Sequence, residues 1–152
     1  MNPKENLAKL HLKLPEVSTP GGNYLSVNIR ANIAYVAIQF PILNEEYLYR
    51  GRLGDELSPE EGYKAMALCA LNVLAQIDKN VGFEKIMGLN HIDAYYQSGA
   101  GWDDAPKVVN GASDLFVNIL EAKGEHARAI FGVATLPRNF SVGLTASFTL
   151  IN

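Results

Sequence analysis

A chain of 152 residues is the length of one domain, and 48% hydrophobic with 19% charged residues supply enough apolar material for a folded core. Thirteen Lys and Arg against sixteen Asp and Glu leave a net charge of -3, which excludes a generally basic surface. No apolar run approaches the roughly 18 residues of a membrane-spanning helix. We therefore expect neither a nucleic-acid nor a membrane partner.

The cysteine content and the N-terminal sequence indicate a reducing compartment. Cys69 has no second cysteine with which to form a disulfide within the chain, and the opening MNPKENLAKLHLKLP lacks the apolar stretch of a signal peptide. We therefore expect a cytoplasmic protein. Cys69 lies in an apolar predicted helix without cationic neighbours, so it is interpreted as a core side chain and not as a reactive thiol.

Prolines and glycines between residues 15 and 22 separate a short N-terminal extension, at about residues 1–20, from the rest of a single domain spanning residues 1–152. Periodic leucines in this extension predict a short amphipathic helix. Beyond it, two apolar runs joined by a turn predict a hairpin, and a polar segment predicts a loop that could contain short paired strands. The expected ranges are the helix Asn6–Leu14, the strands Tyr24–Ile29 and Ile33–Phe40, the loop Asn44–Leu57, and the paired strands around Tyr47–Tyr49.

The segment Ser58-Pro59-Glu60-Glu61 predicts the start of a long helix. It combines a hydroxyl N-cap, a proline at the first helical position and a glutamate that completes a capping box. Apolar side chains at three- and four-residue spacing continue this helix, and further strand-like and helical segments follow. The expected ranges are the helix Pro59–Asn80, the strand Glu84–Tyr95, the helix Ala105–Lys123, and the strands Ala127–Ala134 and Ser141–Leu150.

This order of elements predicts an α+β domain in which a sheet packs on two helices. Two helices cover only one face of such a sheet, yet the run Ile33–Phe40 is apolar on both faces, so we expect its second face to contact another subunit. The last strand alternates between an apolar face and a face of small polar residues. The apolar face has Val142, Leu144, Ala146, Phe148 and Leu150, and the polar face has Ser141, Gly143, Thr145, Ser147 and Thr149.

Short catalytic and metal-binding motifs are absent from the sequence. It contains no phosphate-binding glycine loop, no nucleophile elbow and no paired-cysteine zinc spacing. His11, His91 and His126 fall on three different predicted elements, so we do not expect a metal site. The pair Asp103-Asp104 directly precedes a helix and is interpreted as an N-cap, not as a pair of catalytic acids.

Arg128 differs from the other charged residues because it lies within the apolar strand run ARAIFGVA. An unpaired guanidinium is costly in such a position. Arg128 therefore needs a carboxylate partner, an anionic ligand, or exposure at the edge of the sheet, and the residue pattern leaves these three alternatives open.

Several stretches together resemble the RidA/YjgF family of reactive-intermediate deaminases, also called the YjgF/chorismate mutase-like group. The resemblance covers most of the chain, and its most specific part is His126-Ala127-Arg128 with the later Leu136-Pro137. Other matching stretches are Gly22-Asn23-Tyr24, Gln39-Phe40-Pro41, Glu61-Gly62-Tyr63, LNVLAQ at residues 71–76, VVNGAS at residues 108–113 and Gly132-Val133-Ala134. The resemblance implies a chorismate mutase-like fold and a homotrimer with a central barrel and pockets between subunits, which agrees with the strand that is apolar on both faces.

The resemblance also implies an activity and a set of site residues. Family deaminases hydrolyse enamines and imines of the 2-aminoacrylate type to 2-keto acids and ammonia, without metal or organic cofactor. The family's carboxylate-binding arginine falls on Arg128, its pocket tyrosine on Tyr24 and its helix asparagine on Asn110. Tyr24 is also compatible with a packed strand aromatic, and Asn110 with a backbone contact at a subunit interface.

Two features depart from the family pattern. Gly143 and Thr145 stand where family deaminases carry glutamates, one of which positions the attacking water, and Ile38 stands where the family has a small glycine in the pocket. Gly143 and Thr145 would then line a pocket without an acid. Two functions stay open: hydrolysis of reactive enamine or imine acids, and non-catalytic binding of a small carboxylate. A ribonuclease is disfavoured by the scattered cations, and chorismate mutase activity would rest on fold similarity alone.

Overall fold

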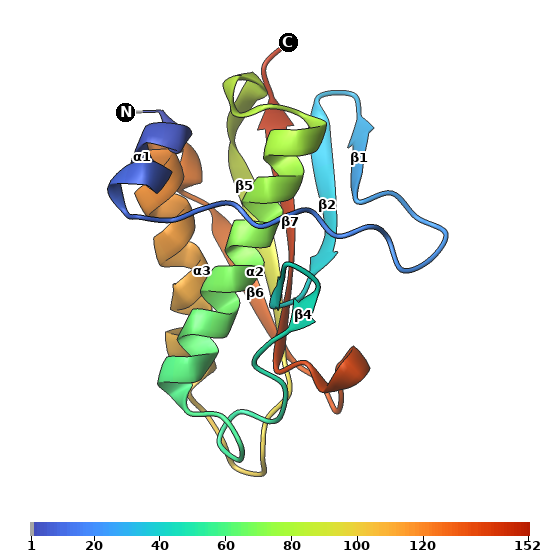
Figure 1. The fold of residues 1–152 in the computed structure, drawn as a ribbon, viewed down its shortest axis with the longest axis vertical. Helices are drawn as coiled ribbons and strands as arrows, with labels where there is room; N and C mark the ends of the chain where they lie inside the picture. The colour runs from blue at the N-terminus through green and yellow to red at the C-terminus, as the bar shows by residue number, and fades with distance from the viewer. Residues whose placement is uncertain (1) are drawn as a thin grey trace.

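The computed structural model describes residues 2–152 and shows one mixed sheet with its long helices on a single face (Figure 1). The five strands run in the order β1-β2-β7-β5-β6, and neighbours are antiparallel except for the parallel pair β5 and β6. The strands are β1 (Val27–Arg30), β2 (Ile33–Gln39), β5 (Ile86–Tyr96), β6 (Ala127–Gly132) and β7 (Val142–Leu150). The helices are α1 (Pro3–Lys9), α2 (Pro59–Asn80) and α3 (Ala105–Leu120).

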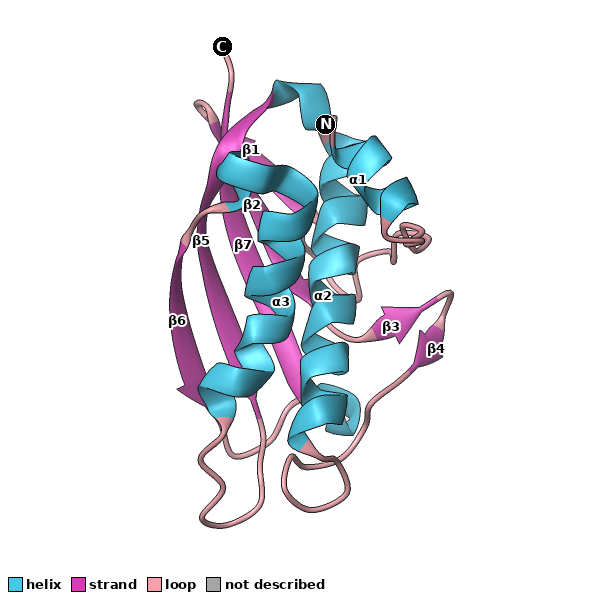
Figure 2. Ribbon diagram, turned by 90° about the vertical axis from the view of Figure 1, so that its left-hand side faces the viewer, coloured by secondary structure: helices cyan, strands magenta, loops and turns pink. Residues whose placement is uncertain are grey.

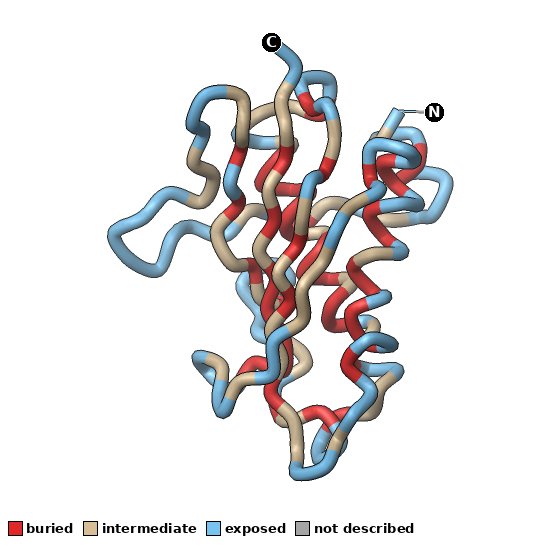
Figure 3. Tube along the Cα trace, turned by 180° about the vertical axis from the view of Figure 1, so that it is seen from behind, coloured by how far each residue is buried: buried red, intermediate tan, exposed pale blue. Residues whose placement is uncertain are grey.

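Helices α2 and α3 lie side by side on one face of the sheet, and the other face is open within residues 2–152 (Figures 2 and 3). Strand β7 shows the predicted alternation, because Leu144 and Phe148 are fully buried on the helix side whereas Thr145 on the open side is half-buried. This arrangement confirms the predicted α+β class and the packing of the sheet on two helices.

In the part of the chain that the structure describes, no helix has the length and hydropathy to cross a membrane.

Helix α2 begins and ends where the sequence predicts. The Ser58 hydroxyl accepts a hydrogen bond from the Glu61 backbone N–H, and the Glu61 carboxylate accepts one from the Ser58 N–H, each at 3.1 Å. This capping box satisfies two of the backbone donors that the first turn of a helix leaves unpaired. The local sequence therefore fixes the start of the helix before any tertiary contact is made.

The prediction for the N-terminal helix is wrong by three to five residues, because α1 covers Pro3–Lys9 and not Asn6–Leu14. The Asn2 side chain accepts a hydrogen bond from the Glu5 N–H, and Pro3 occupies the first turn, so the helix begins earlier than the leucine spacing indicates. The helix has ended by His11, whose φ of 56° lies in the left-handed region. Leu12 and Leu14 still pack against the core, but as extended chain.

The first strand is also shorter than predicted, since it begins at Val27 and not at Tyr24. The Tyr24 hydroxyl accepts a hydrogen bond from the Gly21 N–H at 3.1 Å, and the Tyr24 N–H donates to the Gly22 carbonyl at 3.0 Å. These two local bonds hold residues 21–24 in a bent conformation in which strand pairing cannot begin. Tyr24 therefore lies outside the sheet with half of its side chain exposed.

Other element boundaries differ from the expected ones by a few residues. The predicted paired strands occur slightly earlier, as β3 (Ile42–Leu43) with β4 (Glu46–Tyr47). Short 3-10 turns replace the start of the predicted strand Glu84–Tyr95 at η1 (Phe83–Lys85) and the end of the predicted helix Ala105–Lys123 at η2 (Glu121–Gly124), and a third, η3 (Pro137–Asn139), lies in the connection between the last two strands. Strand β6 ends at Gly132, two residues before the predicted end. Asp104 occupies the N-cap position of α3, but its side chain makes no capping hydrogen bond, so the proposed capping role of Asp103-Asp104 is wrong at the level of the side chain.

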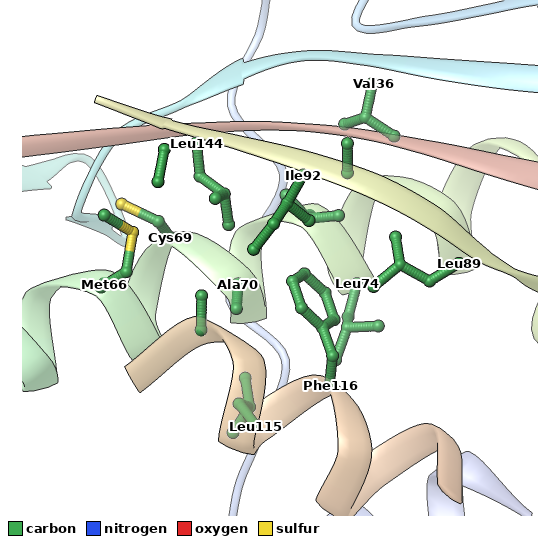
Figure 4. Close-up of a cluster of buried hydrophobic side chains, with 14 of the residues drawn as sticks. Val36, Met66, Cys69, Ala70, Leu74, Leu89, Ile92, Leu115, Phe116 and Leu144 are labelled. Carbon is green, nitrogen blue, oxygen red and sulfur yellow. The ribbon is translucent and has the colours of Figure 1, made fainter. Parts of the chain in front are cut away.

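The core lies between the sheet and the two long helices (Figure 4). Cys69 and Leu74 from α2 and Phe116 from α3 point toward Ile92 and Leu144 of the sheet, and all five are fully buried. Burial raises the pKa of the Cys69 thiol far above its usual value. Cys69 therefore behaves as a small apolar core residue, as the sequence predicts.

Two glycines allow α2 and α3 to approach closely. A Cβ on Gly111 of α3 would collide with the backbone carbonyl of Tyr63 in α2, and a Cβ on Gly62 would lie 2.8 Å from side-chain atoms of Leu53 and Val108. The Tyr63 hydroxyl donates to the Asp114 carboxylate at 2.6 Å across the same interface. Backbone therefore meets backbone at Gly111, where no side chain can move aside.

We expect Gly111→Ala to destabilise the protein by about 2 kcal/mol in chemical unfolding. Helix propensity alone favours alanine by ~1 kcal/mol, so the collision with the Tyr63 carbonyl must outweigh that gain. Asn118→Ala, on the exposed side of the same helix, is the matched control and should change the free energy of unfolding by less than about 0.5 kcal/mol. Equal stabilities of the two variants would show that the close helix contact does not constrain the fold.

Candidate functional site

Arg128 lies on β6, an edge strand, and its side chain extends toward the helix side of the sheet. In the parallel pairing of β5 and β6 it stands beside Ile92, which is fully buried under the helices. Its Nη1 atom donates to Asn110 Oδ1 at 2.9 Å and to Ser113 Oγ at 3.2 Å, and both acceptors belong to α3. No carboxylate pairs with Arg128 within residues 2–152, so neutral polar atoms hold this half-buried guanidinium in place.

Two further residues that the sequence did not single out as a site join this group. Ser113 Oγ lies 2.9 Å from His126 Nε2, and His126 Nδ1 lies 2.6 Å from the Gly124 carbonyl oxygen. The sequence spacing could have indicated this group. Asn110 and Ser113 are three residues apart on a helix, and His126 and Arg128 are two residues apart at a strand, so the members of each pair lie on the same face. A helix and a strand that pack together bring two such pairs into contact.

Tyr24 belongs to a separate region, around a cavity of about 490 Å³ that is lined by residues before β1, residues at the end of β2 and residues near η3. Tyr24, Ile38 and Gln39 line this cavity, and so do Phe40 and Phe140, whose rings stack with centroids 4.9 Å apart. The guanidinium carbon of Arg138, which also lines the cavity, lies 5.7 Å from the centre of the Tyr47 ring. The cavity therefore combines an aromatic wall with one cationic side chain, Arg138, two carboxylates, Glu16 and Glu45, and several neutral polar groups.

Gly143 borders the same region from β7. A Cβ at this position would lie 2.9 Å from Ile38 Cδ1 and 3.0 Å from Phe40 Cε1. Ile38 thus fills the space that a side chain on residue 143 would need. The two departures from the family pattern that the sequence analysis notes, at positions 38 and 143, are one steric feature of the fold.

The structure does not bring the two groups together within one chain. Arg128 pairs with Ile92 on the helix side, whereas Gly143 pairs with Tyr95 and Thr145 with Asp93 on the open side of the sheet. Tyr24 precedes the opposite edge strand, β1, in the chain and lines the cavity together with Ile38. Arg128 and Asn110 are therefore adjacent, whereas Tyr24 and Ile38 line one cavity that Gly143 borders. Thr145 lies two residues from Gly143 on the same open face and does not line that cavity.

The histidines do not form a metal centre in the described part of the chain. His91 Nε2 lies 2.8 Å from Asp93 Oδ1 on the open face, and His126 belongs to the Arg128 group. His11 lies beyond the end of α1. Residues 2–152 contain no group of three or more His, Cys, Asp or Glu side chains that could hold a metal ion.

Comparisons with known proteins agree with this fold and these motifs. The chain belongs to the YjgF/chorismate mutase-like endoribonuclease family, whose model matches residues 4–150. It is 32% identical over 149 residues to protein TCP17 of Trypanosoma cruzi, covering 97% of this chain and 93% of that protein. The structure of a candidate endoribonuclease from Shewanella oneidensis MR-1 is 30% identical, with a TM-score of 0.96 over 99% of this chain and 100% of that one.

A more distant structure shares the fold. RidA from an Antarctic Psychrobacter is 18% identical to this chain, with a TM-score of 0.62 over 88% of this chain and 94% of that one. The resemblance that the sequence motifs indicate is thereby confirmed at the level of the family.

The steric link between Ile38 and Gly143 can be tested by a double-mutant cycle. We expect Gly143→Ala to cost about 1 kcal/mol of stability, because the new methyl group collides with Ile38 and Phe40. In an Ile38→Ala background the same change should cost less, with a coupling free energy of about 0.5–1 kcal/mol. Additive effects in urea unfolding would contradict the contact.

Proposed function

We propose that this protein binds small 2-keto and 2-imino carboxylates through Arg128 and hydrolyses reactive enamine and imine acids. The observation that carries the proposal is how Arg128 is held. Asn110 and Ser113 occupy its Nη1 donors, whereas its Nε and Nη2 donors have no hydrogen-bond partner within residues 2–152. Nε–H and Nη2–H point the same way along one edge of the guanidinium, which is the geometry that a carboxylate accepts with two oxygens.

A homotrimer with a central barrel would complete the pocket, because one chain separates its two halves. In this proposal the Arg128 edge of one subunit faces the Tyr24 and Ile38 cavity of the next. The open sheet face supports such an assembly: Tyr35 is 52% exposed and Phe131 45% exposed, and the Phe131 ring stacks on Tyr95 with centroids 5.4 Å apart. Large exposed side chains gathered on one sheet face are typical of a surface that another subunit covers.

The chemistry requires little from the protein beyond orientation and proton transfer. Water attacks the carbon of the bound imine acid, and the resulting carbinolamine releases ammonia and leaves a 2-keto acid. The carboxylate held on Arg128 fixes the position of that carbon. Proton transfer by a positioned group contributes a further 10² to 10⁴ in rate, roughly.

A binding protein without catalysis is the second candidate, and the geometry at residue 143 favours it. Gly143 carries no acid, and Ile38 blocks the space into which an acid would project. A pocket that keeps the carboxylate-binding arginine but loses the acid would retain affinity for small carboxylates. Such a protein would bind 2-keto acids without accelerating imine hydrolysis.

The first test compares wild-type protein with Arg128→Ala. We expect Arg128→Ala to weaken binding of a 2-keto acid by about 100-fold in calorimetry, since two charge-assisted hydrogen bonds are lost. Arg128→Lys keeps the positive charge but not the paired donors, so its affinity for the 2-keto acid should lie between those of the wild type and Arg128→Ala. Arg30→Ala, at the opposite edge of the sheet, serves as control. Unchanged affinity at an unchanged oligomeric state would refute the assignment of the carboxylate site.

The second test asks whether an acid at position 143 restores a faster reaction. Because Ile38 occupies the required space, we expect Gly143→Glu alone to fold poorly and the double variant Ile38→Gly, Gly143→Glu to be accommodated. The double variant should release ammonia and 2-keto acid from 2-aminoacrylate generated in situ faster than wild type, by about 10-fold or more. A folded double variant without a rate gain would show that an acid at this position does not limit the reaction.

A further inference from the structure

The Arg128 group contains a chain of hydrogen bonds whose direction follows from the chemistry of its members. The Gly124 carbonyl oxygen can only accept, so His126 Nδ1, at 2.6 Å from it, carries the hydrogen in the neutral ring. His126 Nε2 then has a lone pair and accepts the Ser113 hydroxyl proton across 2.9 Å. A serine hydroxyl thus points at a histidine whose tautomer a backbone carbonyl sets.

The imidazole of His126 is also fixed in orientation. The edge of the Phe116 ring packs against it, with centroids 6.0 Å apart and planes 76° apart. Gly124 is buried, and a side chain there would collide with the Phe116 carbonyl. The Gly124 backbone, whose carbonyl bonds to His126, is therefore packed closely against the backbone of α3 and held in place. The histidine therefore receives a proton without first having to reorient.

Ser113 keeps one hydrogen-bonding position for another molecule. A hydroxyl oxygen donates one hydrogen and accepts up to two hydrogen bonds. Ser113 Oγ donates to His126 Nε2 and accepts from Arg128 Nη1 at 3.2 Å, which leaves one lone pair. The bond from the guanidinium also stabilises negative charge on Oγ while a proton passes through it. Ser113, His126 and Arg128 are all half-buried, so a small molecule can reach the group.

We propose that Ser113 and His126 form a proton relay that activates the water attacking an imine acid held on Arg128. The proposal rests on the imine-hydrolysing function proposed above. It assigns a base to the arginine side of the pocket, where no carboxylate of residues 2–152 pairs with Arg128, and makes an acid at residue 143 unnecessary. Ser113 touches the water, and His126 acts through Ser113.

The proton and electron balance of the step is complete with these groups and solvent water. The imine acid reacts in its protonated form, with a C=NH2+ group. As the water oxygen forms a bond to its carbon, the C=N π electrons move to nitrogen, which becomes a neutral amine. The water proton passes to Ser113 Oγ, and the Ser113 hydroxyl proton passes to His126 Nε2. In the second half the proton returns from His126 through Ser113 to the amino nitrogen, which becomes –NH3+. The C–N bond then breaks with its electron pair on nitrogen, ammonia leaves, a lone pair of the hydroxyl oxygen forms the C=O bond of the 2-keto acid, and the hydroxyl proton passes to solvent water.

The experiment separates catalysis from binding with Ser113→Ala and His126→Ala. Each variant is assayed for 2-aminoacrylate hydrolysis and titrated with pyruvate as an unreactive 2-keto acid. We expect kcat to fall by about 10²-fold in both, with the pyruvate Kd changed less than threefold. Ser113→Thr keeps the hydroxyl and should retain most of the activity. Asn118→Ala, on the exposed side of the same helix as Ser113, is the matched control and should leave kcat unchanged.

Chemical rescue distinguishes a relay from a purely structural role of the histidine. Added imidazole should restore kcat of His126→Ala in a concentration-dependent way, which repair of packing alone would not do. Wild-type kcat in Ser113→Ala would overturn the relay while the deaminase function stands. A wild-type protein that binds pyruvate through Arg128 but does not accelerate hydrolysis would also overturn the relay and leave the binding function. If Arg128→Ala binds pyruvate as wild type does, the proposed function itself fails.

Discussion

The backbone contact at Gly111 is the constraint on which both the core and the arginine site depend. Because Gly111 packs against the Tyr63 carbonyl, α3 has one distance from α2 and one rotation about its own axis. That rotation turns Asn110 and Ser113, on either side of Gly111 in the sequence, toward β6 and Arg128. A helix that moved outward by the width of a methyl group would lose these bonds together with its core packing.

The elements that the sequence predicts best are those whose ends are set locally. Helix α2 has a complete capping box in four consecutive residues, and β7 has an uninterrupted alternation, so both were predictable without tertiary information. The misplaced starts of α1 and β1 depend on single side-chain bonds, at Asn2 and at Tyr24, that compete with the hydrophobic pattern. The spacing of apolar residues indicates which side chains pack against the core but not whether the backbone is helical. Leu12 and Leu14 pack against the core outside the helix.

Part of the candidate site was likewise predictable from the sequence, and part was visible only in the structure. The sequence indicated that Arg128 needs a polar partner, and the family motif placed Asn110 near the same pocket, but neither could show that Ser113 and His126 complete the group. Their contact depends on how far α3 lies from β6 and on the turn through Gly124, and neither quantity is encoded in a short motif. The link between Ile38 and Gly143 was likewise visible only once β2 and β7 were paired.

The two halves of the proposed pocket differ in what they can contribute to chemistry. The Ile38 side offers aromatic walls together with Arg138 and the carboxylates Glu16 and Glu45, and residue 143 itself is a glycine that contributes no acid. The Arg128 side holds a guanidinium, a hydroxyl and an imidazole joined in one hydrogen-bonded chain. Ile38 occupies the space into which an acid at residue 143 would project, so in the proposed pocket the serine side supplies the group that takes the proton of the attacking water. In the proposed pocket Arg128 orients the substrate carboxylate and His126 takes the proton, and both are hydrogen-bonded to Ser113 Oγ. Orientation of the substrate and activation of the water therefore depend on the same turn of α3.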